Sequence, residues 1–517
     1  MSWPPRDARH LLVSGSQMAA LEQELFGSGL PVEALMEKAA LAVTRRIQHQ
    51  WHDHLRLHGA LVLVGPGHNG GDGLVIAREL HLAGVSVAIW SPFERHKPLS
   101  DRQLRHALWL GIPRLEQPPE PGAPLLWIDA LFGIGQSRAP GAEIEGLLAE
   151  RDQLRPGTLV AVDSPTGICT DSGRLLGNTA ARARTTYVIG LFKTGLVQDA
   201  ALGWVGQLER IDLGVPARLL QSLPPDQPLG LHPGDLKTLP PLSLEPAAGK
   251  YGRGRLLVVA GSDPYPGAAL LAMLGADASG CGSLRAALPP ALAAGLWMRM
   301  PHAVLAQALP CHPSGSLDLS LLKAVELDRF DAVLVGPGIG AAEAASRAAE
   351  SGAWECLQQF SGLLVLDADG LNRLDSAWLA RRRGPTWITP HRAEFDRLFV
   401  DLTAVPPLEA AAAASGRCGA VVLLKGAHTV LASPDGRRWQ VLQSASEVAR
   451  TGLGDVLAGY AAGRGAMAAA SDGAALAEHL AAAALAHASA GLTLQREGVV
   501  PSPERIAAAL INQNSIS

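Results

Sequence analysis

Residues 449–459 read Ala-Arg-Thr-Gly452-Leu-Gly454-Asp455-Val-Leu-Ala-Gly, and this stretch decides how the C-terminal half is interpreted. It leads into an apolar, alanine-rich run to about Met467, which predicts a buried helix. Glycines at a helix start leave backbone amides free at the positive end of the dipole, where phosphate oxygens bind. Asp455 in the first turn would stand beside that phosphate and could accept a proton from an attacking hydroxyl. Taken alone, the stretch also fits a glycine turn with an acid favouring the helix dipole.

The composition indicates a multidomain α/β protein. A chain of 517 residues is long enough for two or more domains. It is 48% hydrophobic but only 4% aromatic, and its abundant Ala and Gly suit tightly packed α/β layers. The formal charge of −4, from 44 basic and 48 acidic residues, argues against nucleic acid as a partner, because no basic excess exists to neutralise phosphates.

The cysteines and the N-terminus predict a cytoplasmic location. The five cysteines are scattered and form no CxxC pair, which favours reduced thiols over disulfides or zinc. They are Cys169, Cys281, Cys311, Cys356 and Cys418. We expect no signal peptide and no membrane span, because the apolar runs are interrupted by Gly, Pro and charged residues.

Strands alternate with helices through the N-terminal half. An apolar run at 59–64 predicts a buried strand, and the loop Gly-Pro-Gly-His-Asn-Gly-Gly-Asp-Gly follows at 65–73. A helix is expected from about Leu74 to Leu82. Further strands are expected at 85–90, 125–129, 159–163 and 186–189. This alternation is typical of a parallel, helix-covered sheet.

The spacing Gly65-x-Gly67-x-x-Gly70 matches the dinucleotide-binding fingerprint in its usual strand-to-helix context. That fingerprint also needs an acidic residue about 20 positions later, at the tip of the second strand. Here Glu94 is only approximately placed, so an ordinary NAD-dependent dehydrogenase is the weaker interpretation. The side-chain oxygens of Asn69 and its neighbours allow the loop to bind more than phosphate.

Three other predicted strand ends carry charged residues, namely Asp129, Asp163 and Lys193. Each acidic residue taken singly could be a turn residue that caps the following helix. In an open α/β sheet, however, ligands bind beyond the carboxyl ends of the strands, where these side chains would converge. Together they favour a binding site.

The loops at 65–73, Asp129-Ala-Leu-Phe-Gly-Ile-Gly135 and 162–167 (Val-Asp-Ser-Pro-Thr-Gly) resemble the NAD(P)H-hydrate epimerase domain. The resemblance covers about residues 10–220. It implies a Rossmann-like α/β/α sandwich that interconverts the R and S hydrates of NADH and NADPH. By resemblance the substrate contacts would be His68, Asn69, Gly70, Gly71, Asp72, Gly133, Ile134, Gly135, Gln136, Ser137, Arg138, Ala139 and Asp163.

The resemblance also implies a potassium ion held by Asn69, Asp129 and Thr166, and oxygen ligands suit such a hard cation. The family usually has Asn where His68 stands and Ser where Thr166 stands, so His68 is expected to alter substrate affinity. We take Asp163 and Lys193 as candidates for proton transfer at the hydrated carbon.

A proline-rich junction separates the two halves. Pro224, Pro225 and Pro228, followed by Pro240 and Pro241, cannot continue a helix or a central strand. We therefore expect a boundary near 222, with domains at 1–222 and 223–517.

Each strand predicted in the C-terminal half ends in a polar or glycine-rich loop. The strands are expected at 256–261, 333–335, 363–366, 386–388 and 420–424. Taken singly, the Gly-x-Gly-x-Gly loop at 336–340 could be a simple turn, His391 a helix cap and Lys425 a solvated edge residue. No Walker A pattern is present. An anion hole with a carboxylate base nevertheless favours phosphoryl transfer to a hydroxyl, which depends mainly on positioning and charge stabilisation.

The combination Gly336-Pro-Gly-Ile-Gly, Asp367-Ala-Asp-Gly-Leu-Asn, Thr389-Pro-His-x-x-Glu-Phe and Lys425-Gly-Ala-x-Thr resembles the ribokinase-like superfamily. Within it, residues 230–510 are similar to ADP/ATP-dependent NAD(P)H-hydrate dehydratases, of which bacterial members use ADP. The resemblance implies a ribokinase-like α/β domain with Mg²⁺ accompanying the nucleotide. It implies nucleotide contacts at Lys425, Gly426, Ala427, His428, Thr429 and Gly454. Substrate contacts would be Ala268, Gly338, His391 and Asp455.

In the implied reaction Asp455 removes the proton of the C6 hydroxyl as that oxygen attacks ADP, and the resulting phosphate ester then leaves. The products are NAD(P)H, AMP and phosphate. The family usually has Thr-Gly-Gly-Thr-Gly-Asp at 450–455, so Arg450, Thr451 and Leu453 depart from it and are expected to affect nucleotide affinity.

Two alternatives remain at this point. The chain could be a small-molecule kinase with an N-terminal regulatory domain, or a non-catalytic scaffold. We expect small-molecule partners (hydrates of NADH and NADPH, and ADP), no nucleic acid, no membrane, and a homo-oligomer that is a tetramer or larger.

Overall fold

The computed structural model describes residues 3–239, 242, 249–342, 344–444, 446–471 and 476–514. It divides into two compact units, Arg6–Gln227 and Pro228–Ser517, and the second unit also includes Met1–Pro5. The division at Gln227 falls a few residues after the expected boundary, and the expected proline run at 240–241 lies outside the described residues.

The first residues of the chain are anchored in the C-terminal unit by tryptophan hydrogen bonds. The Trp3 indole donates to the Asp235 carbonyl oxygen over 3.0 Å, and the Trp439 indole donates to the Trp3 carbonyl oxygen over 3.1 Å. Trp3 is buried. The chain therefore crosses between the units twice, near Pro5 and near Gln227.

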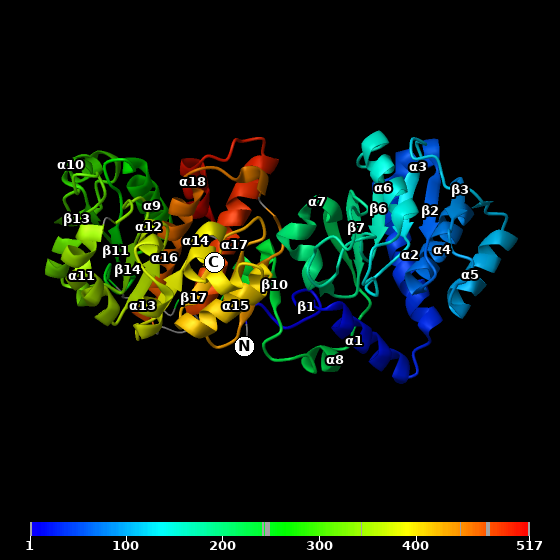
Figure 1. Ribbon diagram of the computed structural model, residues 1–517, viewed down its shortest axis with the longest axis horizontal. Helices are drawn as coiled ribbons and strands as arrows, with labels where there is room; N and C mark the ends of the chain where they lie inside the picture. Colours follow the sequence, from blue (N-terminus) through cyan, green and yellow to red (C-terminus); the bar gives the residue numbers. More distant parts are fainter. Residues whose placement is uncertain are drawn as a thin grey trace. The chain divides into compact units, whose positions relative to one another are not determined.

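The N-terminal unit is built on a seven-stranded parallel sheet in the order β4-β3-β2-β5-β6-β7-β9 (Figure 1). Its strands are β2 (Ala60–Val64), β3 (Val87–Trp90), β4 (Arg114–Leu115), β5 (Leu126–Ala130), β6 (Leu159–Val162), β7 (Thr185–Ile189) and β9 (Gln207–Ile211). The strand order reverses between β2 and β5. In parallel sheets ligands bind at such a switch point.

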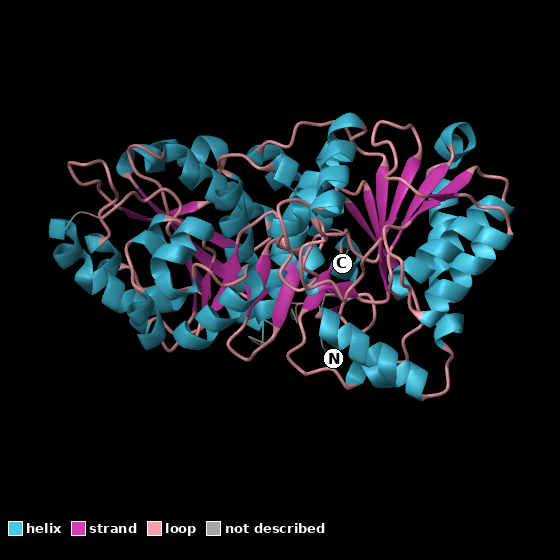
Figure 2. Ribbon diagram, turned by 45° about the vertical axis from the view of Figure 1, so that its right-hand side comes forward, coloured by secondary structure: helices cyan, strands magenta, loops and turns pink. Residues whose placement is uncertain are grey.

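Helices cover both faces of this sheet (Figure 2). On one face α4 (His68–Leu82) lies on β2, β3 and β5, with α2 (Val32–Gln50) and α5 (Pro98–Trp109) against it. On the other face α6 (Ala142–Leu154) shares a hydrophobic cluster with Leu61 and Leu63 of β2. The α/β expectation for this half is confirmed.

Helix α4 begins at His68, whereas the sequence led us to expect a loop as far as Gly73. The glycines serve close packing inside the helix rather than a turn. A Cβ on Gly70 would lie 2.0 Å from the Gly65 carbonyl oxygen, and a Cβ on Gly73 would lie 2.5 Å from the Ala130 Cβ. Asn69 therefore lies in the first turn of a closely packed helix.

The C-terminal unit contains a ten-stranded sheet in the order β10-β19-β18-β17-β16-β15-β14-β11-β12-β13, in which only β18 pairs antiparallel to its neighbours. The central strands are β11 (Arg255–Val259), β14 (Ala332–Val335), β15 (Leu363–Leu366), β16 (Thr386–Ile388) and β17 (Val421–Leu424). These confirm the five expected strands. The others are β10 (Leu229–Leu231), β12 (Ser283–Leu288), β13 (Val304–Ala308), β18 (Val430–Ala432) and β19 (Arg438–Val441).

Helices cover both faces of the larger sheet as well (Figure 2). On one face lie α9 (Pro266–Ala278) and α16 (Leu453–Ser471), with α17 (Leu476–Arg496) and α18 (Pro503–Asn514) against them. A Cβ on Gly459 of α16 would lie 1.9 Å from the Ala272 carbonyl oxygen of α9, so small residues let the two helices meet closely. On the other face lie α11 (Ala344–Gln359), α13 (Ser376–Arg381) and α15 (Pro407–Cys418).

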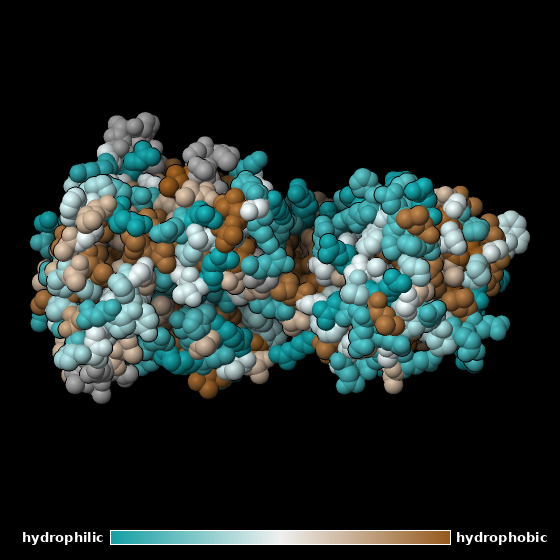
Figure 3. Space-filling model, turned by 90° about the horizontal axis from the view of Figure 1, so that it is seen from above, coloured by the Kyte–Doolittle hydropathy of each residue, from teal (hydrophilic) through white to brown (hydrophobic). Residues whose placement is uncertain are grey.

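The surface drawn in Figure 3 shows hydrophobic side chains in small groups among hydrophilic ones. Among the described residues, no helix is long and apolar enough to cross a membrane.

Candidate active sites

The first candidate site is a cavity of about 560 Å³ at the carboxyl ends of β2, β5 and β6 in the N-terminal unit. Eight of the expected substrate contacts line it: His68, Asn69, Asp72, Gly133, Ile134, Gly135, Gln136 and Asp163. The other expected contacts do not line it: Gly70, Gly71, Ser137, Arg138 and Ala139. Two of these, Gly70 and Gly71, are in the first turn of α4 and pack against Gly65 and Met36 instead.

Asp163 and Lys193 form a buried ion pair at this cavity. The Lys193 Nζ donates to Asp163 Oδ1 over 2.5 Å and to the Ile189 carbonyl oxygen over 2.7 Å. Backbone amides of Ile189 and Ile134 donate to the two carboxylate oxygens, each over 3.2 Å. Asp163 also has φ of 66°, which is uncommon outside glycine. The carboxylate is thus held in one orientation, with Lys193 behind it and outside the cavity lining.

Two further carboxyl groups line the cavity near this pair. Glu22 lies on α1 (Gly15–Gly27), and burial together with the Asp163 charge raises the pKa of Glu22 to about 7, although Lys193 opposes the shift. Burial, Asp163 and Glu22 raise the pKa of Asp72. We did not predict a role for Glu22 from the sequence. On an amphipathic helix, the sequence does not distinguish a glutamate that lines a cavity from one that faces water.

Of the expected potassium ligands, Asp129 and Thr166 are buried and in direct contact, and Asn69 lines the cavity. Asp129 is fully buried and accepts hydrogen bonds from the Thr166 hydroxyl (2.8 Å), the Thr166 amide (2.8 Å) and the Leu131 amide (3.2 Å). Burial raises the pKa of Asp129 to about 6 against these hydrogen bonds. Both polar atoms of the Asn69 side chain are buried without a hydrogen-bond partner. The residues fit a cation, because Asn69 has a free amide oxygen and Asp129 has no basic partner among the described residues.

The second candidate site lies at the carboxyl ends of β15, β16 and β17 in the C-terminal unit. Lys425 Nζ donates to Asp367 Oδ1 over 2.7 Å, and the Thr389 hydroxyl donates to the same oxygen over 2.8 Å. Burial lowers the pKa of Lys425, but Asp367 and Glu394 outweigh this and the net shift is upward. A Cβ on Gly454 would lie 3.4 Å from the ammonium group, so Lys425 stands directly at the start of α16.

Asp455 occupies the first turn of α16, as the sequence predicted. Burial raises its pKa to about 7, and the carboxylates of Asp367, Asp369 and Glu394 add to the shift while Lys425 opposes it. The Lys425 ammonium is thus close to three carboxyl groups, Asp367, Glu394 and Asp455, and is hydrogen-bonded to Asp367. A carboxyl group that titrates near neutral pH beside an anion site is suited to general base catalysis.

The expected substrate contacts Ala268 and Gly338 adjoin one another near the switch point between β11 and β14. Gly338 has φ of 62°, and a Cβ there would lie 2.6 Å from the Ala268 Cβ. His391 is exposed and caps α14 (Arg392–Leu398), accepting from the amides of Ala393 and Glu394. His391 therefore has the helix-capping role that we considered as the simpler one. It also lines the cavity described next, which we call the nucleotide-side cavity.

The nucleotide-side cavity has a volume of about 510 Å³. Five of the six expected nucleotide contacts line it: Lys425, Gly426, Ala427, Thr429 and Gly454. His428 does not, and its side chain is buried. Arg450 and Leu453, which depart from the family pattern, do line the cavity, as do Gln443 and His487, which the sequence did not single out.

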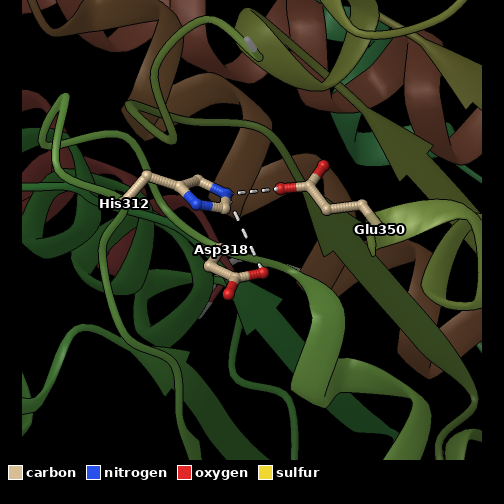
Figure 4. A group of neighbouring side chains, drawn as sticks. All are labelled: His312, Asp318 and Glu350. Atoms are coloured by element: carbon tan, nitrogen blue, oxygen red, sulfur yellow. Dashed lines mark hydrogen bonds and ion pairs between the residues drawn. The ribbon is translucent and has the colours of Figure 1, made fainter. Parts of the chain in front are cut away.

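His312, Asp318 and Glu350 form a separate cluster with the spacing of metal ligands (Figure 4). The His312 Nε2 lies 3.4 Å from Glu350 and 3.8 Å from Asp318. However, Arg373 already donates to both Glu350 oxygens, over 2.8 and 3.0 Å, and a metal ion would compete with this guanidinium for the same atoms. We therefore assign the cluster a structural role.

Arg373 links this cluster to the second site. Its remaining nitrogens donate to the carbonyl oxygens of Gly340 (3.0 Å) and Ile339 (2.9 Å), in the loop that contains Gly338. Glu350 anchors the guanidinium, and the guanidinium holds the loop.

Each unit matches the model of a protein family. Residues 256–512 match the family described as NAD(P)H-hydrate dehydratase, and residues 32–195 match the family described as YjeF-related protein N-terminus. The chain thus combines both domain classes, in the order that the two sites suggest.

Two relatives match most of the chain. The chain is 42% identical to the bifunctional NAD(P)H-hydrate repair enzyme Nnr of Gloeobacter violaceus, over 87% of either chain. It is 40% identical to the enzyme of the same name from Synechocystis, over 95% of this chain and 91% of the relative. A solved ADP/ATP-dependent NAD(P)H-hydrate dehydratase from Bacillus subtilis is a more distant neighbour, with 24% identity, a TM-score of 0.46, and coverage of 55% of this chain and 98% of that one. The chain belongs to the family of bifunctional NAD(P)H-hydrate repair enzymes.

Proposed function

We propose that the N-terminal unit interconverts the R and S hydrates of NADH and NADPH, and that the C-terminal unit dehydrates the S form at the expense of ADP. The observation that carries the dehydratase assignment is Asp455, a carboxyl group with a pKa near 7 in the first turn of α16, next to Lys425 and the Gly454 amide. The arrangement suits transfer of a phosphoryl group to a hydroxyl.

Dehydration proceeds in two steps. Asp455 accepts the proton of the C6 hydroxyl as that oxygen bonds to the terminal phosphorus of ADP, and the bond to AMP breaks. The ring nitrogen then donates its electron pair as the C6–O bond breaks and phosphate leaves, and the adjacent carbon loses a proton to give the reduced nicotinamide. By the resemblance, Ala268, Gly338 and His391 would contact the hydrate; Ala268 and Gly338 adjoin each other, and His391 lines the nucleotide-side cavity.

The phosphates of ADP bind at the Lys425–Thr429 loop and the Gly454 amide, where the helix dipole and the Lys425 ammonium stabilise negative charge. Mg²⁺ bound with the nucleotide would supply further charge neutralisation. Asp367 already accepts hydrogen bonds from Lys425 and Thr389, and the carboxyl groups around it form no group of three metal ligands among the described residues, so the phosphates of the nucleotide would hold the ion.

In the epimerase, Glu22 and Asp163 divide the proton transfers. Protonated Glu22 donates its proton to the C6 hydroxyl, which leaves as water while the ring nitrogen forms a double bond to C6. Water then adds to the opposite face, and Asp163 accepts its proton. Lys193 keeps the Asp163 carboxylate in place through the 2.5 Å ion pair. Solvent exchange restores both carboxyl groups.

Asn69, Asp129 and Thr166 would hold a potassium ion, which would supply positive charge for the substrate's phosphate oxygens. A homo-oligomer and a cytoplasmic location remain predictions from the sequence.

The test is an absorbance assay of the reduced nicotinamide. Pure S hydrate and an R/S mixture of hydrated NADH are supplied with ADP or with ATP. We expect the absorbance to return with ADP, and the mixture to be consumed completely because the epimerase converts R to S. Accumulation of a stable phosphoester without recovery of absorbance would instead identify a small-molecule kinase.

A further inference from the structure

Two residues that line the nucleotide-side cavity carry buried hydrogen-bond acceptors that have no partner among the described residues. They are Gln443 Oε1, in the loop after β19, and His487 Nε2, on α17, and both atoms are shielded from solvent. The cavity around them is mostly apolar, with walls formed by Val441, Val448, Leu457, Ala484, Ala488 and Ile506. Unpaired polar atoms in an apolar cavity are unfavourable, so a ligand that pairs with them gains affinity.

The state of His487 defines what that ligand must offer. Burial lowers the pKa of His487 to about 4, and the nearby Lys425 adds to this, while a hydrogen bond with the Leu453 backbone opposes the shift. The imidazole is therefore neutral near pH 7. Because the Leu453 bond favours protonation, its partner is the carbonyl oxygen and it uses the N–H of the neutral ring, which leaves Nε2 as an acceptor. The ligand must supply a donor.

We infer that His487 and Gln443 recognise the exocyclic amino group of an adenine base. This inference rests on the proposed ADP-dependent function and adds to it the residues that select the base. An amino group supplies two N–H donors for the two acceptors, and the apolar walls suit the faces of a purine ring. Lys425, in the lining of the same cavity, is available for the phosphates.

The same contacts exclude guanine. Guanine carries a carbonyl oxygen at the position of the adenine amino group. That oxygen would face the His487 acceptor without a proton between them, so at this position guanine offers neither acceptor a donor. A Gln443 side chain rotated to present its amide nitrogen would still leave the His487 acceptor unpaired.

The experiment measures equilibrium binding to the full-length protein by calorimetry, with no hydrate present so that nothing turns over. The ligands are ADP, purine riboside diphosphate (which lacks only the amino group) and 2′-deoxy-ADP. We expect the unaltered protein to bind ADP about tenfold tighter than purine riboside diphosphate, as expected for loss of paired buried donors. His487→Leu should weaken ADP binding about tenfold and change purine riboside diphosphate binding less than about twofold.

Two further variants make the result decisive. Gln443→Leu should cause the same selective loss of ADP binding. This variant replaces His487→Leu in the test if His487→Leu does not fold. His479→Leu, a buried histidine on the same helix that does not line the cavity, should preserve the preference for ADP. Equal weakening of both purines by His487→Leu would reduce the residue to a structural role. A selective loss against 2′-deoxy-ADP would assign it to the ribose, and equal binding of the two purines by the unaltered protein would also overturn the inference.

Binding and turnover separate this inference from the proposed function. Adenine discrimination without dehydration would contradict the function alone. Dehydration without discrimination would contradict the inference alone.

Discussion

Asp163 follows strand β6 in the N-terminal unit, and Asp455 lies in the first turn of helix α16 in the C-terminal unit. The two carboxylates differ in how firmly their neighbours hold them. Asp163 is fixed by Lys193 and by two backbone amides. The Asp455 carboxylate accepts no hydrogen bond among the described residues, and burial and neighbouring carboxylates raise its pKa to about 7. A fixed carboxylate can direct one proton acceptor at a defined face of the substrate. An unpaired one can change protonation during turnover.

The same contrast applies to the acids that accompany them. Glu22, near Asp163, has a pKa of about 7 and is protonated in a large fraction of molecules at neutral pH. The N-terminal site therefore contains an acid beside a fixed carboxylate, whereas the C-terminal site contains a base beside a lysine. These differences lead to predictions that separate the two activities in one chain.

The largest expected effect is that of Asp455→Asn on dehydration. Loss of the general base should lower kcat with pure S hydrate and ADP by about 10²- to 10⁴-fold. Epimerisation, followed by chromatographic separation of R and S forms, should stay within about twofold. Asp401→Asn, which removes an exposed partner of Arg417, is the matched control and should leave both rates unchanged. A dehydratase rate of Asp455→Asn within threefold of the unaltered protein would remove Asp455 as the base.

Asp163→Asn should affect stability as well as epimerisation. It leaves the buried Lys193 ammonium without its carboxylate, which costs about 3–5 kcal/mol in comparable buried pairs. Chemical denaturation should show this loss in the transition of the N-terminal unit, and the epimerase rate should fall about a hundredfold or more. The control is Asp152→Asn, whose exposed pair with Arg182 should contribute no more than about 1 kcal/mol. If both variants are equally stable, the buried pair does not hold the site.

The two activities should respond to pH in opposite directions. Asp455 acts when ionised, so dehydration should rise with pH and reach half of its maximum near pH 7, with about a tenfold fall per unit well below that. Glu22 acts when protonated, so epimerisation should fall as pH rises through about 7. Each rate is measured separately across the range, after subtraction of the reaction without enzyme. Glu22→Gln should lower the epimerase rate and abolish its fall at high pH, and profiles that bend in the same direction would contradict these roles.

The sequence predicted most of the strand ends that form the two sites. Buried apolar runs followed by glycine or polar residues located the loops after β14 and β15, and Asp455 at the start of α16. It did not predict that α4 begins at His68, because glycines selected for close packing look like turn residues. It also missed β12, whose Ser283–Leu288 segment includes Arg285 and small residues in place of a continuous apolar run. Glu22 and His487 acquire their environments only from the packing of distant segments.

The smallest predicted effect tests the geometry that holds Asp455 in place. Gly452, just before α16, has φ of 91°, and a Cβ there would lie 2.5 Å from the Leu271 side chain. Gly452→Ala should therefore destabilise the C-terminal unit by about 1–2 kcal/mol, the usual cost of a left-handed alanine. A shift of the helix start would also move the Gly454 amide away from the phosphates, so we expect the KM for ADP to rise several-fold and kcat to change less.

The matched control for this variant is Gly416→Ala within α15, where a Cβ meets nothing within 4 Å. Removing a glycine from a helix interior usually stabilises by about 0.5–1 kcal/mol, so this variant should be slightly more stable and fully active. Denaturation and ADP titration of both variants separate the two effects. If Gly452→Ala keeps its stability and its KM, the start of α16 tolerates a side chain at this position. The placement of Asp455 would then not require a left-handed backbone, whereas Asp163 itself has a left-handed backbone, with φ of 66°.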